Sequence, residues 1–140
     1  MNLSNKMTGA VKAYNQVGVD TDVASASPHR LIQMLMEGVI QKIAIAKGHM
    51  MRGEIADKGA HISWAISIID GLRMSLNKEA GGEIAQNLDG LYEYMQSGLM
   101  EANMHNNQGK LDEVSNLMRE IKSGWDAIAD VVKDKSEEVA

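Results

Sequence analysis

Four histidines are the first candidates in this chain for metal binding or acid–base catalysis. His29, His49, His61 and His105 are scattered over three predicted helical segments. A paired metal site in a helical bundle needs Glu-x-x-His spacing, which presents a carboxylate and an imidazole to the same interior. Glu101 and His105 are four residues apart rather than three. The spacing therefore predicts no metal site, and each lone histidine is interpreted as a surface or capping group.

Two further motifs could suggest a nucleophile or a phosphate site. Ser25 and Ser27 would act as nucleophiles only beside a base and an orienting acid, whereas capping of the following helix needs nothing else. The run Gly81-Gly82-Glu83 lacks a preceding strand and a Lys-Ser or Lys-Thr pair, so it is interpreted as a loop. The sequence predicts no catalytic residue, no cofactor and no enzyme.

The net charge and the composition of the chain limit the classes of partner that it can bind. The 140 residues carry a net charge of -5 and no cysteine. Acidic and basic residues are interleaved, whereas a nucleic-acid backbone requires clustered Lys and Arg. No run of about 18 apolar residues occurs, so no membrane insertion is expected. We expect a cytoplasmic protein that binds no nucleic acid.

Four long segments with helical periodicity must position whatever site exists. The first begins at Pro28, behind the capping residue Ser27, and runs to about Met51. The others span roughly 54–76, 79–104 and 108–132, and the last repeats apolar residues in steps of three and four. Because short breaks cannot span back along a helix of about 35 Å, consecutive helices must be antiparallel. This predicts an all-α, antiparallel up-down four-helix bundle.

The chain is predicted to form one domain over residues 1–140. Residues 1–26 are expected to form a mobile arm with a short helix, residues 27–132 the bundle, and residues 133–140 a frayed tail. The arm would act as a removable lid, with Tyr14, Val17 and Val19 as its anchors.

The amount of apolar surface is larger than one core contact requires. Trp64 and Ile68 widen the stripe of their segment to roughly 200°, and Met34 and Ile45 extend that of the preceding one. One interpretation is that neighbouring helices and the arm cover this excess. The other is a groove for an amphipathic partner helix, with 11 methionines supplying adaptable contacts.

Several stretches are distinctive enough to indicate a family. The stretch AYNQVGVDTDVASASPHRLIQMLMEG resembles the opening signature of FliS, the flagellar export chaperones that bind flagellin. AISIIDGLRMSLNKEAGGEIAQNLDGLYEYMQSGLMEAN is similar to the family's central block, and LDEVSNLMREIKSGW to its last helix. The resemblance covers residues 10 to 126. It implies a four-helix bundle that holds the disordered C-terminal segment of flagellin without ATP, which prevents premature polymerisation and keeps flagellin competent for flagellar type III export.

The resemblance also implies roles for particular residues. The N-terminal motif and the apolar block after it match at Tyr14, Val17, Val19, Ser25, Ala26, Ser27, Pro28, Leu31, Ile32, Met34 and Leu35. The surplus of apolar surface, rather than a motif, adds Ile62, Trp64, Ile66, Ile68 and Ile69 to the expected groove. Met36 departs from the family, which commonly has an aromatic residue there, and this could alter client affinity or specificity.

Three alternatives remain open from sequence. The bundle could be an adaptor for another amphipathic peptide or a self-associating dimer. The family also suggests secondary contacts with the anti-sigma factor FlgM or the export gate protein FlhA. A metal- or ligand-dependent bundle enzyme is the alternative of a different class.

Overall fold

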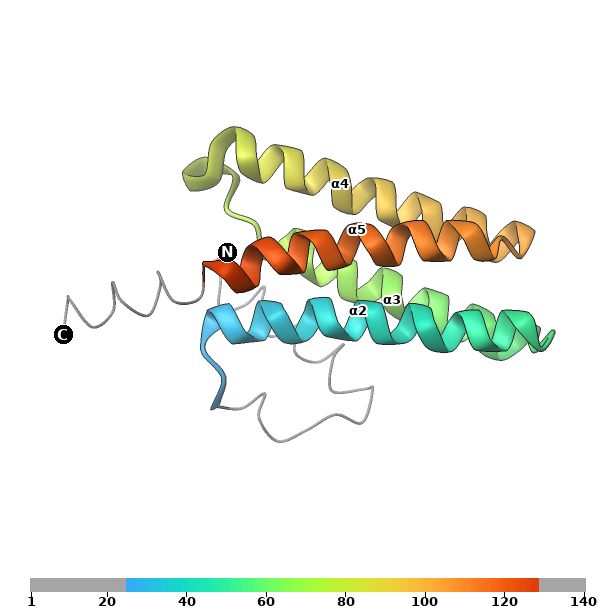
Figure 1. The fold of residues 1–140 in the computed structure, drawn as a ribbon. Coiled ribbons are helices and arrows are strands. Elements are labelled where there is room, and N and C mark those ends of the chain that lie inside the picture. The colour runs from blue at the N-terminus through green and yellow to red at the C-terminus, as the bar shows by residue number, and fades with distance from the viewer. Residues whose placement is uncertain (1–24, 129–140) are drawn as a thin grey trace.

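A computed structural model describes residues 25–128, which form four helices and no strand. The helices are α2 (Pro28–Met51), α3 (Ile55–Met74), α4 (Lys78–His105) and α5 (Gln108–Ala127). In Figure 1, α2 and α4 run in one direction and α3 and α5 in the other. Each helix packs against the next, and α5 packs back against α2. The predicted antiparallel four-helix bundle is confirmed.

Some sequence predictions fall outside the described residues. They concern the arm before Ser25, including Tyr14, Val17 and Val19, the end of the last segment beyond Ile128, and the tail. These predictions stay untested.

Side-chain caps determine where three of the helices begin. Ser27 Oγ accepts a hydrogen bond of 3.1 Å from the Arg30 amide, and Pro28 occupies the first turn. The side-chain oxygens of Asn77 and Asn107 accept the equivalent bonds at the starts of α4 and α5. The predicted bounds of the first bundle helix, Pro28 to Met51, are confirmed.

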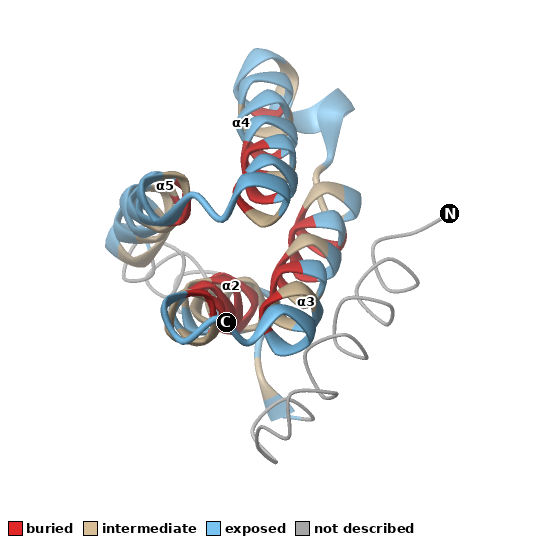
Figure 2. Cartoon of the chain, turned by 90° about the vertical axis from the view of Figure 1, so that its right-hand side faces the viewer, coloured by how far each residue is buried: buried red, intermediate tan, exposed pale blue. Residues whose placement is uncertain are grey.

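The core lies between the four helices, and Figure 2 shows the buried residues on their facing sides. On α2 the buried positions spread over about 200° of the circumference at 100° per residue. The prediction that Ile68 and Met34 extend beyond the core was wrong, because their side chains are 0% and 3% exposed. A helix in this bundle packs against two neighbours, so its buried arc is wider than a single contact needs. Trp64 and Ile45 stay partly exposed.

The turns at one end of the bundle are joined by a buried lysine. Lys58, at the start of α3, is 4% exposed and donates to the Asn103 carbonyl at 2.9 Å and to Asn106 Oδ1 at 2.6 Å. Asn106 has a φ of 52°, in the left-handed region that asparagine tolerates, and ends α4. Lys58 therefore ties the start of α3 to the turn between α4 and α5.

None of the helices between residues 25 and 128 has the length and apolar character needed to cross a bilayer.

Candidate functional site

An apolar pocket lies at the opposite end of the bundle, where α2 and α4 begin and α3 and α5 end. Its volume is about 560 Å³. Every helix contributes to it, and so does the connection between α3 and α4. The lining residues are Pro28, His29, Ile32, Met36, Leu72, Ser75, Leu76, Asn77, Ala80, Gly81, Ile84, Ala85, Leu88, Tyr92 and Trp125.

The exposure of the lining side chains increases sharply from the inside of the pocket to its edge. Met36 and Tyr92 are each 1% exposed, whereas Ile84 is 78% exposed. Burial raises the pKa of the Tyr92 hydroxyl, which keeps this group neutral. A mainly apolar lining with few polar groups suits the apolar face of an amphipathic helix. Ile84 provides exposed apolar surface that such a helix could cover.

His29 and Trp125 form one wall of the pocket. Their rings stack at 4.5 Å between centroids with 8° between planes, and Trp125 Nε1 donates to the His29 carbonyl at 3.0 Å. Within the described range, both ring nitrogens of His29 are buried without a hydrogen-bond partner. The interpretation of His29 as a surface or capping group was therefore wrong. Its ring instead packs against the end of α5.

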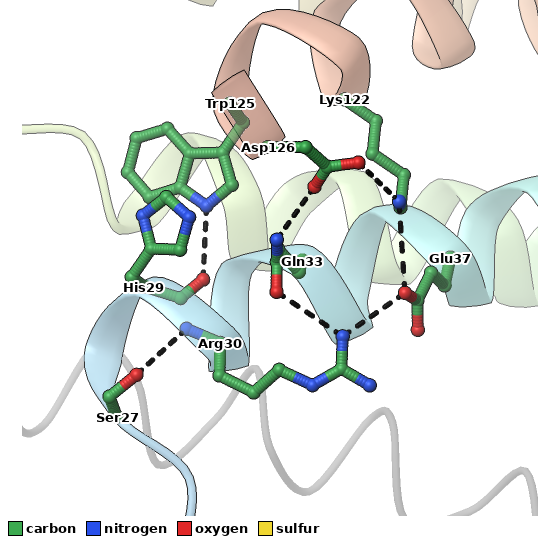
Figure 3. A network of polar contacts seen from close by, with 8 residues as sticks. All are labelled: Ser27, His29, Arg30, Gln33, Glu37, Lys122, Trp125 and Asp126. Carbon is green, nitrogen blue, oxygen red and sulfur yellow. Dashed lines mark hydrogen bonds and ion pairs between the residues drawn. The ribbon is translucent and has the colours of Figure 1, made fainter. Parts of the chain in front are cut away.

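A network of polar contacts holds this wall in place (Figure 3). Gln33 Nε2 donates to Asp126 at 2.7 Å, and Lys122 Nζ donates to the same carboxylate at 2.7 Å. Arg30 pairs with Glu37 at 3.1 Å, and Lys122 lies 3.8 Å from Glu37. The hydrogen bond from Lys122, reinforced by that from Gln33, lowers the pKa of Asp126. The network joins the first turns of α2 to the last turn of α5.

A second ionic cluster lies on the α3–α4 side of the pocket. Arg73 Nε donates to Asp89 at 2.7 Å, and Lys78 Nζ lies 3.1 Å from the same carboxylate. The Asp89 side chain is only 16% exposed. The hydrogen bond from Arg73, followed by that from Lys78, lowers the pKa of Asp89. Asp89 thus links the end of α3 to the first turn of α4.

We expect the stabilising contribution of Asp89 to be lost in acid. Its pKa is lower in the folded than in the unfolded chain, so its contribution is complete above about pH 5, declines below the unfolded pKa of about 4, and is lost as the pH falls through the folded pKa. The difference in unfolding free energy between wild type and Asp89→Asn should shrink between about pH 5 and pH 2. Urea unfolding at a series of pH values measures it.

Asp112→Asn is the matched control for this experiment. Asp112 pairs with Lys47 at 2.9 Å, but its side chain is 51% exposed. An exposed ion pair contributes little to stability, so this variant should follow the wild-type pH dependence closely. Equal pH dependence in Asp89→Asn and wild type would contradict the assigned role of Asp89.

A different surface lies over α2 and α3, away from the pocket. The Lys42 ammonium sits 4.2 Å from the centroid of the Trp64 ring. Lys42 is 4% exposed, and burial lowers its pKa. Beside Trp64, α3 carries a shallow hollow of about 300 Å³ lined also by Ala60, Ser63 and Ser67. This hollow is smaller than the pocket at the end of the bundle.

Comparison with known proteins gives the family. A family model described as "FliS: Flagellar protein FliS" matches residues 10–132. A Pseudomonas aeruginosa protein named flagellar secretion chaperone FliSB is 53% identical over 120 residues, which are 86% of this chain and 95% of that protein. The chain belongs to the FliS family.

Other FliS proteins show the same extent of similarity. The flagellar secretion chaperone FliS of Vibrio cholerae is 44% identical over 122 residues, covering 87% of this chain and 90% of that protein. The FliS of Salmonella typhimurium is 43% identical over 120 residues, covering 85% and 89%. The resemblance found in the sequence is confirmed. FliS is a family of chaperones, so the prediction that the chain is not an enzyme is confirmed as well.

The structure brings some of the sequence-predicted FliS site residues together and separates others. Pro28 and Ile32 line the pocket. Ser25, Ala26 and Ser27 precede α2 directly. Five of the remaining residues are at most 3% exposed: Met34, Leu35, Ile62, Ile68 and Ile69. Three others are partly exposed outside the pocket: Leu31, Trp64 and Ile66.

Sequence reasoning missed most of the pocket. Tyr92 and Leu88 were interpreted only as parts of a helical stretch, and Trp125 only as a member of the last apolar stripe. Ile84 had the signal of an apolar residue two positions after a glycine pair, in the first turn that follows a helix break. His29 had no local signal, since its partner Trp125 lies 96 residues away.

Proposed function

We propose that this protein binds the disordered C-terminal segment of flagellin and holds it without ATP in the cytoplasm. Binding would prevent premature polymerisation and keep flagellin competent for flagellar type III export. Membership of a family named for flagellar secretion chaperones supports the export role. The identity of the client segment is the part that this proposal adds.

The observation that carries the proposal is the apolar pocket with the exposed Ile84 at its edge. A pocket of about 560 Å³ accommodates a few apolar side chains, as a helix face presents them at three- and four-residue spacing. Met36 on the inside and Ile84 at the edge offer apolar contacts over the depth of the pocket. The pocket is therefore the first place where we expect the client helix to dock.

The energetics of such binding fit a holding chaperone. A disordered segment that folds on its partner buries about 1,000–3,000 Å² and loses several kcal/mol to ordering. The pocket alone is too small for that area, so the client must continue over other surfaces. The partly exposed Leu31, Trp64 and Ile66 are proposed as further contacts.

The remaining sequence-predicted elements are proposed parts of the same function. Residues 1–26 are proposed as an arm that covers client-binding surface, with Tyr14, Val17 and Val19 as anchors. Burial of Met34, Leu35, Ile62, Ile68 and Ile69 gives them the role of supporting the surface from below. FlhA and FlgM are proposed as secondary partners.

We expect Ile84→Glu to weaken client binding about 10- to 100-fold. Covering an isoleucine contributes about 1.5–3 kcal/mol, and a carboxylate placed against an apolar helix is not compensated. Because Ile84 is 78% exposed in the free protein, the free energy of unfolding should change by no more than about 0.5 kcal/mol. Titration with a peptide of the flagellin C-terminal segment, followed by tryptophan emission, measures the effect.

Ile55→Glu is the matched control. Ile55 is 70% exposed and lies at the other end of the bundle, as the first residue of α3. Its replacement should leave affinity unchanged. Absence of wild-type binding at micromolar concentration would refute the client assignment, and equal losses in both variants would remove the pocket as the docking site. Measuring the mass of the free protein in solution distinguishes a monomer from the alternative of a self-associating dimer.

A further inference from the structure

The helix α4 is interrupted near its start by Gly82. Gly82 has a φ of 53° and a ψ of −128°, far from helical values. The residues before and after it within α4 are helical. An L-residue rarely adopts this backbone conformation, whereas glycine does so readily. Gly81 is constrained as well, since a Cβ there would lie 2.7 Å from the Ala85 methyl. The glycine pair permits a sharp change of direction that Figure 1 shows at the start of α4.

The single turn before the interruption is closed by a backbone hydrogen bond of 2.8 Å from the Gly81 amide to the Asn77 carbonyl, and two side chains hold it further. Asn77 Oδ1 accepts a hydrogen bond of 3.0 Å from the Ala80 amide, which caps the turn. Lys78 reaches across the interruption to Asp89 at 3.1 Å. Asp89 is also bound by Arg73 at 2.7 Å, so its carboxylate keeps a partner whether or not Lys78 is present. The contact through Lys78 is thus separable from the packing of α3 on α4.

This turn forms part of the pocket wall. Asn77, Ala80 and Gly81 line the pocket before the interruption, and Ile84 and Ala85 line it just after. A change in the dihedral angles of Gly82, accompanied by adjustment of the short connection 75–77 to α3, would therefore move one side of the pocket relative to the other. The movement requires no change in the buried contacts of Tyr92 or Leu99, which lie further along α4.

We propose that residues 78–81 are a hinged flap over the apolar pocket, with Gly82 as the hinge and the Lys78–Asp89 ion pair as its latch. In the closed state the turn bends as observed. In the open state Gly82 takes helical angles, α4 becomes one straight helix, and Asn77, Ala80 and Gly81 withdraw from the wall. The inference rests on the proposed function in so far as the open state is the one that admits the client helix.

Two substitutions shift the equilibrium without altering the pocket's inner side chains. Gly82→Ala disfavours the positive φ and favours a continuous helix, so the ratio of open to closed states should rise about ten-fold or more. Lys78→Gln removes only the latch, and the ratio should rise by up to about five-fold. Lys47→Gln, which breaks the exposed pair with Asp112, is the control for loss of a surface ion pair.

The hinge can be measured directly because the chain has no cysteine. Spin labels on Glu79→Cys and Ser97→Cys, both at exposed positions, span the interruption. In one straight helix these positions are separated by about 27 Å, and the bend shortens the distance. Labels on Gln86→Cys and Met104→Cys have the same spacing entirely after Gly82 and should not change.

We expect Gly82→Ala and Lys78→Gln to lengthen the distance from 79 to 97 in the free protein. Affinity for the flagellin C-terminal peptide should rise in step, since apparent affinity scales with the fraction of competent protein. If Gly82→Ala fails to fold, Lys78→Gln decides alone. Unchanged distances with intact peptide binding would overturn the hinge and leave the proposed function standing. Longer distances with unchanged affinity would overturn its gating role, and peptide binding in no variant would defeat the proposed function together with the gate.

Discussion

Replacing Tyr92 with alanine should destabilise the bundle by about 3–5 kcal/mol and abolish client binding at ordinary peptide concentrations. Tyr92 is 1% exposed, belongs to the core cluster, and lines the apolar pocket. Removing its ring opens a cavity between the core and the pocket, and the surrounding helices can fill it only in part. Chemical denaturation measures the loss of stability.

Tyr92→Phe separates the contribution of the aromatic ring from that of the hydroxyl group. Burial alone, with no hydrogen bond, accounts for the raised pKa of the Tyr92 hydroxyl, so its removal should change the free energy of unfolding by less than about 0.5 kcal/mol. A loss of client affinity in this variant at unchanged stability would show that the hydroxyl contacts the client. A stability loss of several kcal/mol in Tyr92→Phe would contradict the account of the ring as the main contributor.

The part of the fold that local chemistry determines was predictable from sequence. The helix Pro28–Met51 begins where a serine cap precedes the only proline, and both signals act within a few residues. The apolar spacing of the last helix also predicts its buried side, since Leu111, Val114 and Met118 are fully buried. Antiparallel packing followed from helix length and short turns.

Errors arose where neighbouring helices decide the outcome. Ile68 and Met34 were placed beyond the core because a helical wheel assumes one direction of burial, whereas α2 and α3 each contact two neighbours. Gly82 was assigned to a loop, although it lies inside the hydrogen-bonded helix α4 as a single non-helical residue. A glycine pair indicates a break in a helix, but it does not indicate whether a further helical turn precedes the break.

The candidate site was the least predictable part, because it is assembled from every helix. Its wall at His29 and Trp125 joins residues 96 positions apart, and neither has a motif that points to the other. Pro28 and Ile32 were predicted because they lie in the motif at the start of α2. The pocket residues on α3, α4 and α5 could be identified only from the way the four helices pack together.

The residues that stabilise this end of the molecule also surround the proposed docking pocket. Ser75, Asn77 and Ile84 lie at the pocket where the helices separate, and the ionic contacts of Asp89 and Asp126 hold the two sides. A pocket built from helix ends can change its shape without disturbing the central core, where contacts are dense. Under the proposed function, this arrangement would let the pocket adapt to the client while the bundle stays stable.

Trp125→Ala should lower the free energy of unfolding by about 2–4 kcal/mol and weaken client binding by about 30-fold or more. The indole stacks on His29 at 4.5 Å, donates to its carbonyl at 3.0 Å and forms a wall of the pocket. Trp125→Phe keeps an aromatic ring and loses the hydrogen bond, so it should cost only about 1 kcal/mol. Denaturation and peptide titration by calorimetry measure both quantities without relying on tryptophan emission.

Trp64→Ala is the comparison that locates the principal docking surface. Trp64 lies over Lys42 on the α2–α3 side, outside the pocket, so its replacement should weaken client binding less than Trp125→Ala does. A larger loss of affinity in Trp64→Ala would move the principal contact to the α2–α3 surface that the sequence first indicated. Because the stability of each variant is measured in parallel, a loss of affinity caused by partial unfolding can be separated from the loss of a contact.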